Sequence, residues 1–165
     1  MRDASGEGKI SHAMFPGELE SPSASRTSVS ARVRAGRVVG LRLRGVASVS
    51  DIEYLHAGVA AAIKGTTVPA FICGDYRRVA PLSRSVSNIW SRAMRRHNPR
   101  IARSALLLDP ANEMFNLQFE RIVHCAGHPT RRLFSDRGEL FAWLDSELSS
   151  TEREAVRSFF SECDG

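Results

Sequence analysis

The sequence lacks the short motifs that identify the common enzyme classes. It has no G-x-x-x-x-G-K-[ST] phosphate loop, no G-x-G-x-x-G nucleotide fingerprint, no H-E-x-x-H zinc motif and no G-x-S-x-G nucleophile elbow. No recognisable acid–base pair takes their place, so we predict that the protein is not an enzyme.

Long apolar runs are also absent. None approaches the ~20 residues that a membrane-spanning helix needs. The first twenty residues carry Glu7, Glu18 and Glu20 and lack the apolar segment of a signal peptide. We therefore expect no membrane span and a cytoplasmic location.

Cysteine is scarce, and Cys73, Cys125 and Cys163 have no C-x-x-C spacing, so we expect reduced thiols. Only His124, Cys125 and His128 together have the composition of a metal site. Adjacent residues of a helix point in different directions, and a closed zinc site usually needs four ligands. We predict no metal and no cofactor.

Positive charge is concentrated in one part of the chain. The net charge is +5, but residues 26–104 alone carry fifteen basic and three acidic groups, and the basic ones are almost all arginine. A basic half can recruit nucleic acid or another polyanion. The other explanation is an arginine-rich composition on a solvated face, because no aromatic residues interleave with these arginines in the first hairpin.

Residues 1–25 are rich in Gly, Ser, Pro and Glu and have too few apolar residues to form a core, so we expect a disordered tail. Residues 26–165 are expected to form one α/β domain with a C-terminal helical extension.

Alternating apolar and polar residues from position 27 predict a β-hairpin. A three-residue loop at positions 34–36 would pair Ala31 with Val39 and place Gly36 in the left-handed conformation. One face of the hairpin is then apolar, and the other carries the candidate polyanion-binding residues Arg32, Arg42 and Arg44.

The chain is organised around an apolar strand at residues 70–73, a polar turn, and a helix that begins near Ser83. The helix shows an apolar stripe at helical spacing, formed by Val86, Ile89, Trp90, Ala93 and Met94. Such a strand–turn–helix unit is the core of an α/β domain, and its turn is the usual place for a binding site.

The first helix is expected at residues 48–63, with Ser50 and Glu53 at capping-box spacing and Gly65 as its stop. His56 adjoins the buried stripe of this helix, where a packed side chain is more common than a ligand.

The next strand, at residues 101–108, precedes a helix that starts at Asp109-Pro110 and ends at Gly127. An edge strand at 130–134 and two further helices follow, capped by the pairs Asp136/Glu139 and Thr151/Glu154. This order, β-β-α-β-α-β-α-β-α-α, predicts a mixed sheet that starts with a hairpin. We expect the arginine face of the hairpin to be exposed to solvent, so the helices should lie mainly on the other face.

This order, the hairpin start and the size resemble the STAS-like domains, namely the anti-sigma-factor antagonists and their SpoIIAA-like relatives, over roughly residues 27–148. The resemblance implies a noncatalytic partner-switching protein. Antagonists of this type carry a phosphorylatable Ser after an Asp at the start of the helix that follows the central strand. That Asp-Ser pair is absent here, and Ser83 or Ser85 would occupy the position. Some STAS-like and CRAL-TRIO-like folds hold ligands, so by fold analogy a small-molecule or lipid pocket also stays open.

The carboxyl edge of the central strands is the default binding crevice of such a sheet. We expect a regulatory protein partner to bind there, on Asp75, Tyr76, Arg77, Arg78, Ser83 and Ser85. The competing explanations are a salt-bridged turn for the Asp and Arg residues and simple helix caps for the serines. Binding of nucleic acid by the arginine hairpin is the alternative function.

Overall fold

The structure is a computed structural model that describes residues 26–66, 69–162 and 164. The expected tail at residues 1–25 and Cys163 lie outside the described residues. Five strands form one sheet in sequential order: β1 (Ser28–Ala35), β2 (Val38–Arg44), β3 (Ala70–Asp75), β4 (Ile101–Leu107) and β5 (Arg131–Phe134). The β1–β2 pair is antiparallel and the later pairs are parallel.

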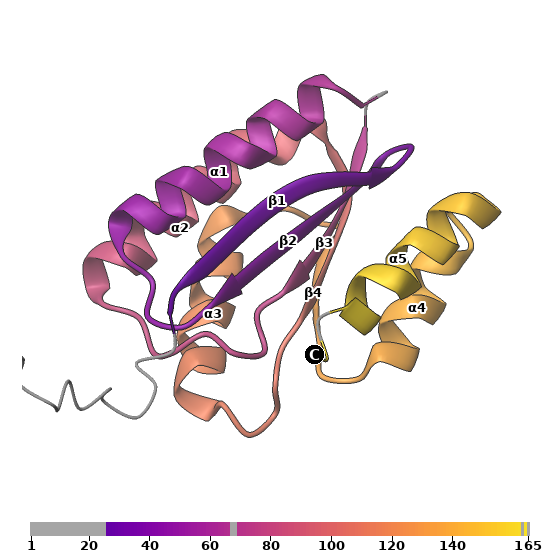
Figure 1. The fold of residues 1–165 in the computed structure, drawn as a ribbon. Coiled ribbons are helices and arrows are strands. Elements are labelled where there is room, and N and C mark those ends of the chain that lie inside the picture. The colour runs from indigo at the N-terminus through magenta and orange to yellow at the C-terminus, as the bar shows by residue number, and fades with distance from the viewer. Residues whose placement is uncertain (1–25, 67–68, 163, 165) are drawn as a thin grey trace, which may run out of the picture.

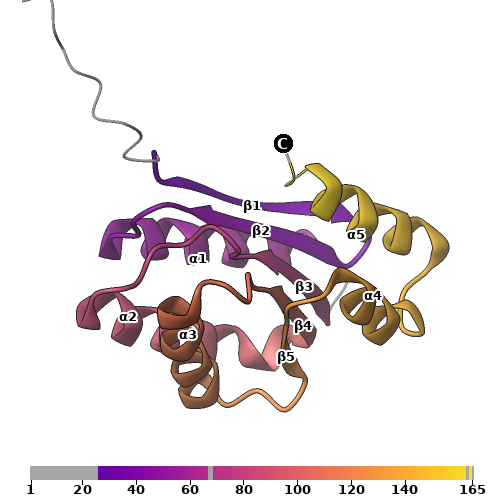
Figure 2. The ribbon, with the colours of Figure 1, turned by 90° about the horizontal axis from the view of Figure 1, so that it is seen from below.

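The connections explain where the helices lie. Each parallel crossover moves to the next strand in the same direction, so right-handed connections place their three helices on one face of the sheet. These are α1 (Val49–Lys64), α2 (Arg84–His97) and α3 (Glu113–Ala126), and a short 3₁₀ turn (Asn98–Arg100) follows α2. Two more helices, α4 (Arg137–Asp145) and α5 (Ser150–Glu162), come after the last strand and pack on the opposite face (Figure 1, Figure 2). The predicted fold class is confirmed.

The hairpin register differs from the prediction by two residues. Ala31 pairs with Leu41 and not with Val39, because the strands continue to a tight turn at Gly36 and a bulge forms before Ala35. An even shift keeps each side chain on its predicted face. Gly36 has a φ of 49°, so its predicted left-handed conformation is confirmed.

The cap of α1 was assigned two residues too late. Ser48, rather than Ser50, accepts a hydrogen bond from the Asp51 amide at 3.2 Å, and the Asp51 carboxylate accepts one from the Ser48 amide at 2.8 Å. Both serines have an acidic residue three positions later, but Ser50 already lies within the helix, which begins at Val49.

Two further helix starts were also misplaced. Asp109 belongs to a turn before α3, whose first residue is preceded by Asn112. At α5, Ser149 and Glu152 exchange amide–side-chain hydrogen bonds of 3.1 and 3.2 Å in place of the predicted Thr151/Glu154 pair. The predicted caps Ser83 and Asp136 and the stop at Gly127 are confirmed.

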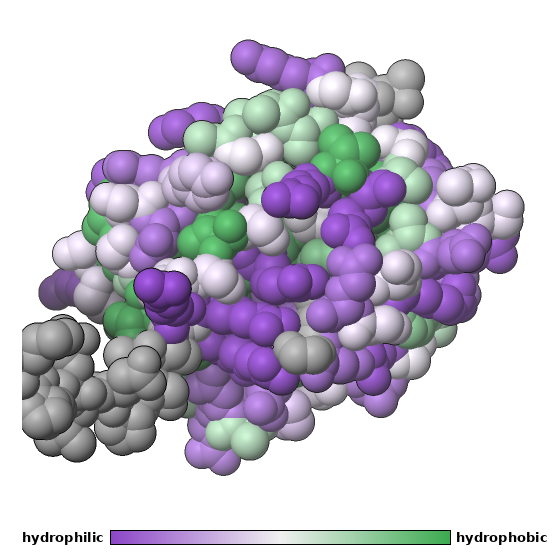
Figure 3. All heavy atoms as spheres, viewed as in Figure 1, coloured by the Kyte–Doolittle hydropathy of each residue, from purple (hydrophilic) through white to green (hydrophobic). Residues whose placement is uncertain are grey.

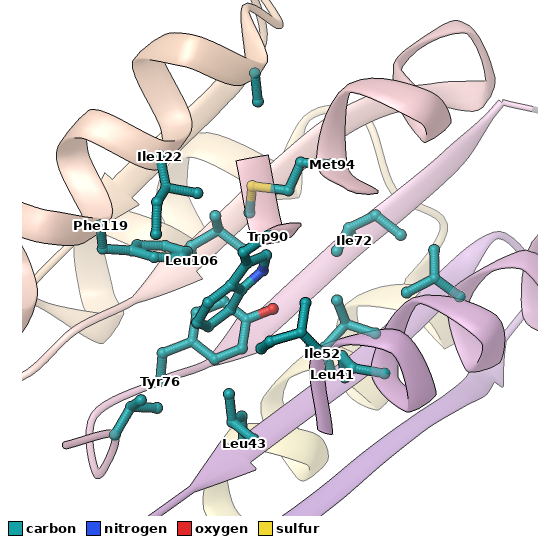
Figure 4. Close-up of a cluster of buried hydrophobic side chains, with 14 of the residues drawn as sticks. Leu41, Leu43, Ile52, Ile72, Tyr76, Trp90, Met94, Leu106, Phe119 and Ile122 are labelled. Carbon is teal, nitrogen blue, oxygen red and sulfur yellow. The ribbon is translucent and has the colours of Figure 1, made fainter. Parts of the chain in front are cut away.

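The sheet separates two apolar cores. The larger core lies under α1, α2 and α3, where Trp90 is fully buried against the rings of Tyr76 and Phe119 (Figure 4). The smaller core lies under α4 and α5 and contains Cys73. Burial raises the pKa of the Cys73 thiol to about 12, so this cysteine is an inert core residue at neutral pH.

Candidate functional site

The turn after β3 is built on a salt bridge. Asp75 is buried, and its carboxylate accepts hydrogen bonds from Nε and Nη2 of Arg77, each at 3.0 Å, and from the Arg77 amide at 3.2 Å. The hydrogen bonds to Asp75 raise the pKa of Arg77 above its ordinary value. The salt-bridged turn that the sequence left as one explanation is therefore present.

Arg77 also joins this turn to the C-terminal end of the described chain. Its Nη1 donates to Asp164 Oδ1 at 3.0 Å, and the other oxygen of Asp164 accepts from Arg137 at 2.5 Å. The hydrogen bonds from Arg137 and Arg77 lower the pKa of Asp164. Part of the expected partner surface is thus occupied by an intramolecular contact.

Tyr76 was expected on the partner surface, and the structure places it in the core instead. Its side chain is 1% exposed and packs edge-on against Trp90 and Phe119 (Figure 4). The chain turns inward at this residue because the aromatic ring fills the space under α2. Tyr76 can support the surface from beneath, but it does not contribute a contact on it.

Residues 78–82 are anchored at several points. Gln118 of α3 accepts from the Leu82 amide at 2.7 Å and donates to the Leu82 carbonyl at 2.8 Å. Asn112 donates to the Val79 carbonyl at 2.7 Å, and Gly45, after β2, bonds to both sides of Val79. These bonds hold the start of α2 in a defined position.

The start of α2 carries the exposed part of the candidate site. Ser83, Arg84 and Ser85 are all exposed, and so is Arg78 in the turn before them. The Ser83 hydroxyl accepts from the Val86 amide at 3.2 Å and caps the helix. The serines and Arg78 thus lie on the surface, whereas Asp75 and Arg77 brace it from below.

A basic groove, which the sequence reading missed, runs from this point between α2 and α3. No carboxylate is among its described lining residues, which include Arg84, Arg92, Arg95 and Arg121. The arginines of α2 lie eight and eleven positions apart and so share one helix face. That spacing was the available signal, but the facing arginine of α3 could not be foreseen without the helix pairing.

The arginine face of the hairpin is less open than predicted. Arg32 is exposed, whereas Arg42 and Arg44 are half-buried, and α5 packs over β1 and β2. The guanidinium of Arg42 lies 5.5 Å from the centre of the Phe159 ring. Hydrophilic side chains still gather over the hairpin, facing the viewer in Figure 3.

Among the described residues, no group of three or more His, Cys, Asp or Glu side chains is arranged to hold a metal ion. His128 is used in the backbone scaffold: its Nδ1 accepts from the Thr130 amide at 3.1 Å, so its Nε2 carries the proton and donates to the Ile101 carbonyl at 3.0 Å. No helix in the described ranges is long and apolar enough to cross a membrane.

Comparison with known proteins identifies the fold. No protein-family model and no curated protein matches the sequence. Among solved structures, a protein from Shewanella loihica PV-4 with a SpoIIAA-like fold is 15% identical, with a TM-score of 0.52 over 72% of this chain and 93% of its own. The unphosphorylated anti-sigma factor antagonist SpoIIAA is 17% identical, with a TM-score of 0.53 over 74% of this chain and 100% of its own. An anti-sigma factor antagonist from Mycobacterium paratuberculosis is 9% identical, with a TM-score of 0.50 over 72% and 94%. The chain therefore has a SpoIIAA-like fold.

Proposed function

We propose that this protein is a noncatalytic regulatory module of the cytoplasm that binds a protein partner at the carboxyl edge of β3. The exposed start of α2, with Arg78, Ser83 and Ser85, is the centre of the proposed surface. These side chains are exposed on a segment that hydrogen bonds from Gln118 and Asn112 hold in place, and this supports the proposal most directly. A pre-organised surface loses little conformational entropy on binding. Anti-sigma factor antagonists with the same fold add support by analogy.

The charge of the neighbouring groove supports an acidic partner. Arg84 belongs both to the start of α2 and to the groove, so the two features form one continuous surface. Its arginines would meet carboxylates on the partner, which increases the association rate and sets the orientation of binding.

Ser83 and Ser85 are the proposed sites of regulation by phosphorylation. A phosphate on either serine would lie beside the free amides of the first turn of α2 and close in sequence to Arg84. The fold should tolerate this group, because the helix start favours negative charge. The surface would become less basic, which should weaken an acidic partner's binding.

The alternative is binding of nucleic acid or another polyanion by Arg32, Arg42 and Arg44. The exposure of Arg32 favours it, whereas the partial burial of Arg42 and Arg44, the former against Phe159 of α5, restricts the surface that a polyanion could reach. The geometry therefore supports the protein partner better.

Affinity capture of the full-length protein from its own cell extract, followed by mass spectrometry, tests the proposal. It should recover an acidic protein and show phosphate on Ser83 or Ser85. The double variant Arg84→Gln/Arg92→Gln should lose the captured protein, and Arg153→Gln, an exposed arginine on α5, should keep it. Equal capture by both variants would refute the proposed surface.

A further inference from the structure

A small internal cavity lies under α1 and α2 against strands β3, β4 and β5. Its volume is about 20 Å³, measured as the space that the centre of a water molecule can reach. The cavity therefore has room for about one water molecule or one ion of similar size. Most of its wall is apolar. Five polar side chains also reach it: His56, Tyr76, His97, Ser104 and Arg131.

Arg131 supplies a buried positive charge to this cavity. Its side chain emerges beside Ser104 on the neighbouring strand, and the residue is 7% exposed. Nη2 donates to Asn98 Oδ1 at 2.9 Å, but Nε and Nη1 have no hydrogen-bond partner among the described residues. Burial lowers the pKa of Arg131 to about 10, so it still carries its charge at neutral pH. A buried charge without a partner is costly, and two unused N–H groups require an acceptor.

The other polar groups of the cavity are neutral and leave that charge unbalanced. The Tyr76 hydroxyl and both ring nitrogens of His56 are buried without partners in the described part of the chain. Burial raises the pKa of Tyr76, so its hydroxyl keeps its proton and can donate. Burial, with help from His97 and Arg131, lowers the pKa of His56 to about 3, so this ring is uncharged. No carboxylate is among the described lining residues.

Two histidine rings separate the cavity from the surface. The rings of His56 and His97 stack with their centres 5.4 Å apart and their planes 6° from parallel. Both rings line the cavity and also the outer groove between α1 and α2. Among the described residues that line this groove, Arg92 and Arg96 face one carboxylate, that of Glu53. The stacked pair thus forms the wall between a basic groove and a basic cavity.

We propose that this cavity binds one small monovalent anion, of the size of chloride, on Arg131 and the Tyr76 hydroxyl. The charge of the ligand follows from the unpaired guanidinium, and its size follows from the cavity volume. The anion enters through the α1–α2 groove by a movement of the His56–His97 pair. This site lies in the core and is independent of the proposed partner surface at the start of α2.

Thermal melts of the full-length protein at constant ionic strength test this site. Sodium chloride is exchanged for sodium gluconate, whose anion is far too large for the cavity. The wild type should show a saturable rise in Tm with chloride, roughly 5–10 °C at a concentration about one hundred times Kd. Arg131→Met should lose the rise. Arg132→Met, which removes the exposed neighbour on the same strand, should keep it.

Two results would overturn the proposal: no chloride-specific rise in the wild type, or the same rise in Arg131→Met. If Arg131→Met does not fold, crystals of the wild type grown in bromide decide the matter. An anomalous peak within hydrogen-bond distance of Arg131 supports the site, whereas density for a water molecule without anomalous signal contradicts it.

Discussion

Arg37, in the turn of the first hairpin, forms a salt bridge with Glu152 of the last helix, 115 residues later in the chain. Nε donates to Oε2 at 3.2 Å, Nη2 to Oε1 at 3.0 Å, and the Arg37 amide to Oε2 at 2.9 Å. Desolvation opposes the ionisation of this buried carboxyl, but the hydrogen bonds from Arg37 and Ser149 outweigh it and lower the pKa of Glu152 to about 2. This contact fastens α5 to the hairpin.

Replacement of Glu152 should therefore destabilise the protein. Glu152→Ala leaves the half-buried Arg37 with the Glu147 carbonyl but without its carboxylate partner, and it removes a helix cap, so we expect a loss of roughly 2–4 kcal/mol in the free energy of unfolding. Urea melts measure it. Glu154→Ala, an exposed neighbour on α5, is the matched control and should stay within about 0.5 kcal/mol. Similar losses in the two variants would contradict the assigned role.

The core of α2 gives a second stability prediction. Trp90 is fully buried, so Trp90→Ala should cost ~3–5 kcal/mol. Arg92→Ala removes an exposed side chain and should stay within about 0.5 kcal/mol. Urea melts of both variants decide it, and equal small losses would mean that the buried face of α2 is wrongly assigned.

The buried His56 predicts an acid sensitivity. It faces His97 and Arg96 of α2, Arg131 of β5 and the hydroxyl of Tyr76, and burial with these positive charges lowers its pKa from 6.5 to about 3. The unfolded chain binds a proton below pH ~6.5 and the folded protein does not, so stability falls as the pH falls from about 6.5 towards 3. The free energy of unfolding should fall by up to about 1.4 kcal/mol per pH unit in this range.

Urea melts of the wild type and of a His56 variant between pH 7 and pH 4.5, in gluconate buffers, measure this slope. The carboxyl groups contribute equally to both proteins, so a difference between their slopes reports on His56. His56→Phe keeps a flat ring against His97 and removes the titrating nitrogens, so its stability should fall less steeply with acid. Parallel curves for the wild type and His56→Phe would rule out this residue as the cause.

The sequence predicted correctly those features that depend on residues within a single helix or strand. The stripe around Trp90, the cap at Ser83 and the helix end at Gly127 all depend on local spacing, and the structure confirms them. Tyr76 was misjudged because it stands in a polar stretch of sequence and is buried by elements that come from elsewhere in the chain. The α2–α3 groove, the Arg37–Glu152 contact and the cavity depend on such long-range pairing in the same way.

The polyanion alternative makes its own prediction. If Arg32, Arg42 and Arg44 bind nucleic acid, affinity must fall steeply with salt, because each phosphate contact releases counterions. The triple change to Gln should then abolish binding with little effect on the urea melt. Titration of labelled DNA and RNA at low salt checks this, and the absence of binding by the wild type would remove the alternative.

Two roles of the serines at the start of α2 can be separated by substitution. If Ser83 or Ser85 is a phosphorylation switch, Ser→Asp should weaken partner binding by about tenfold or more, since it places a like charge against an acidic partner. Ser→Ala should bind normally and escape regulation. If the serines are only caps, the Asp variants should bind normally, because Asp caps a helix as well as Ser does.

The dissociation constant of the captured partner is the most direct test of the proposed function. We predict that at least one of Ser83→Asp, Ser85→Asp, Asp75→Asn and Arg77→Ala raises it about tenfold or more, while the control Arg153→Gln leaves it unchanged. Circular dichroism of each variant should confirm that the fold is intact. If all four variants bind with the affinity of the wild type, the carboxyl edge of β3 is not the partner surface, and the central claim is wrong.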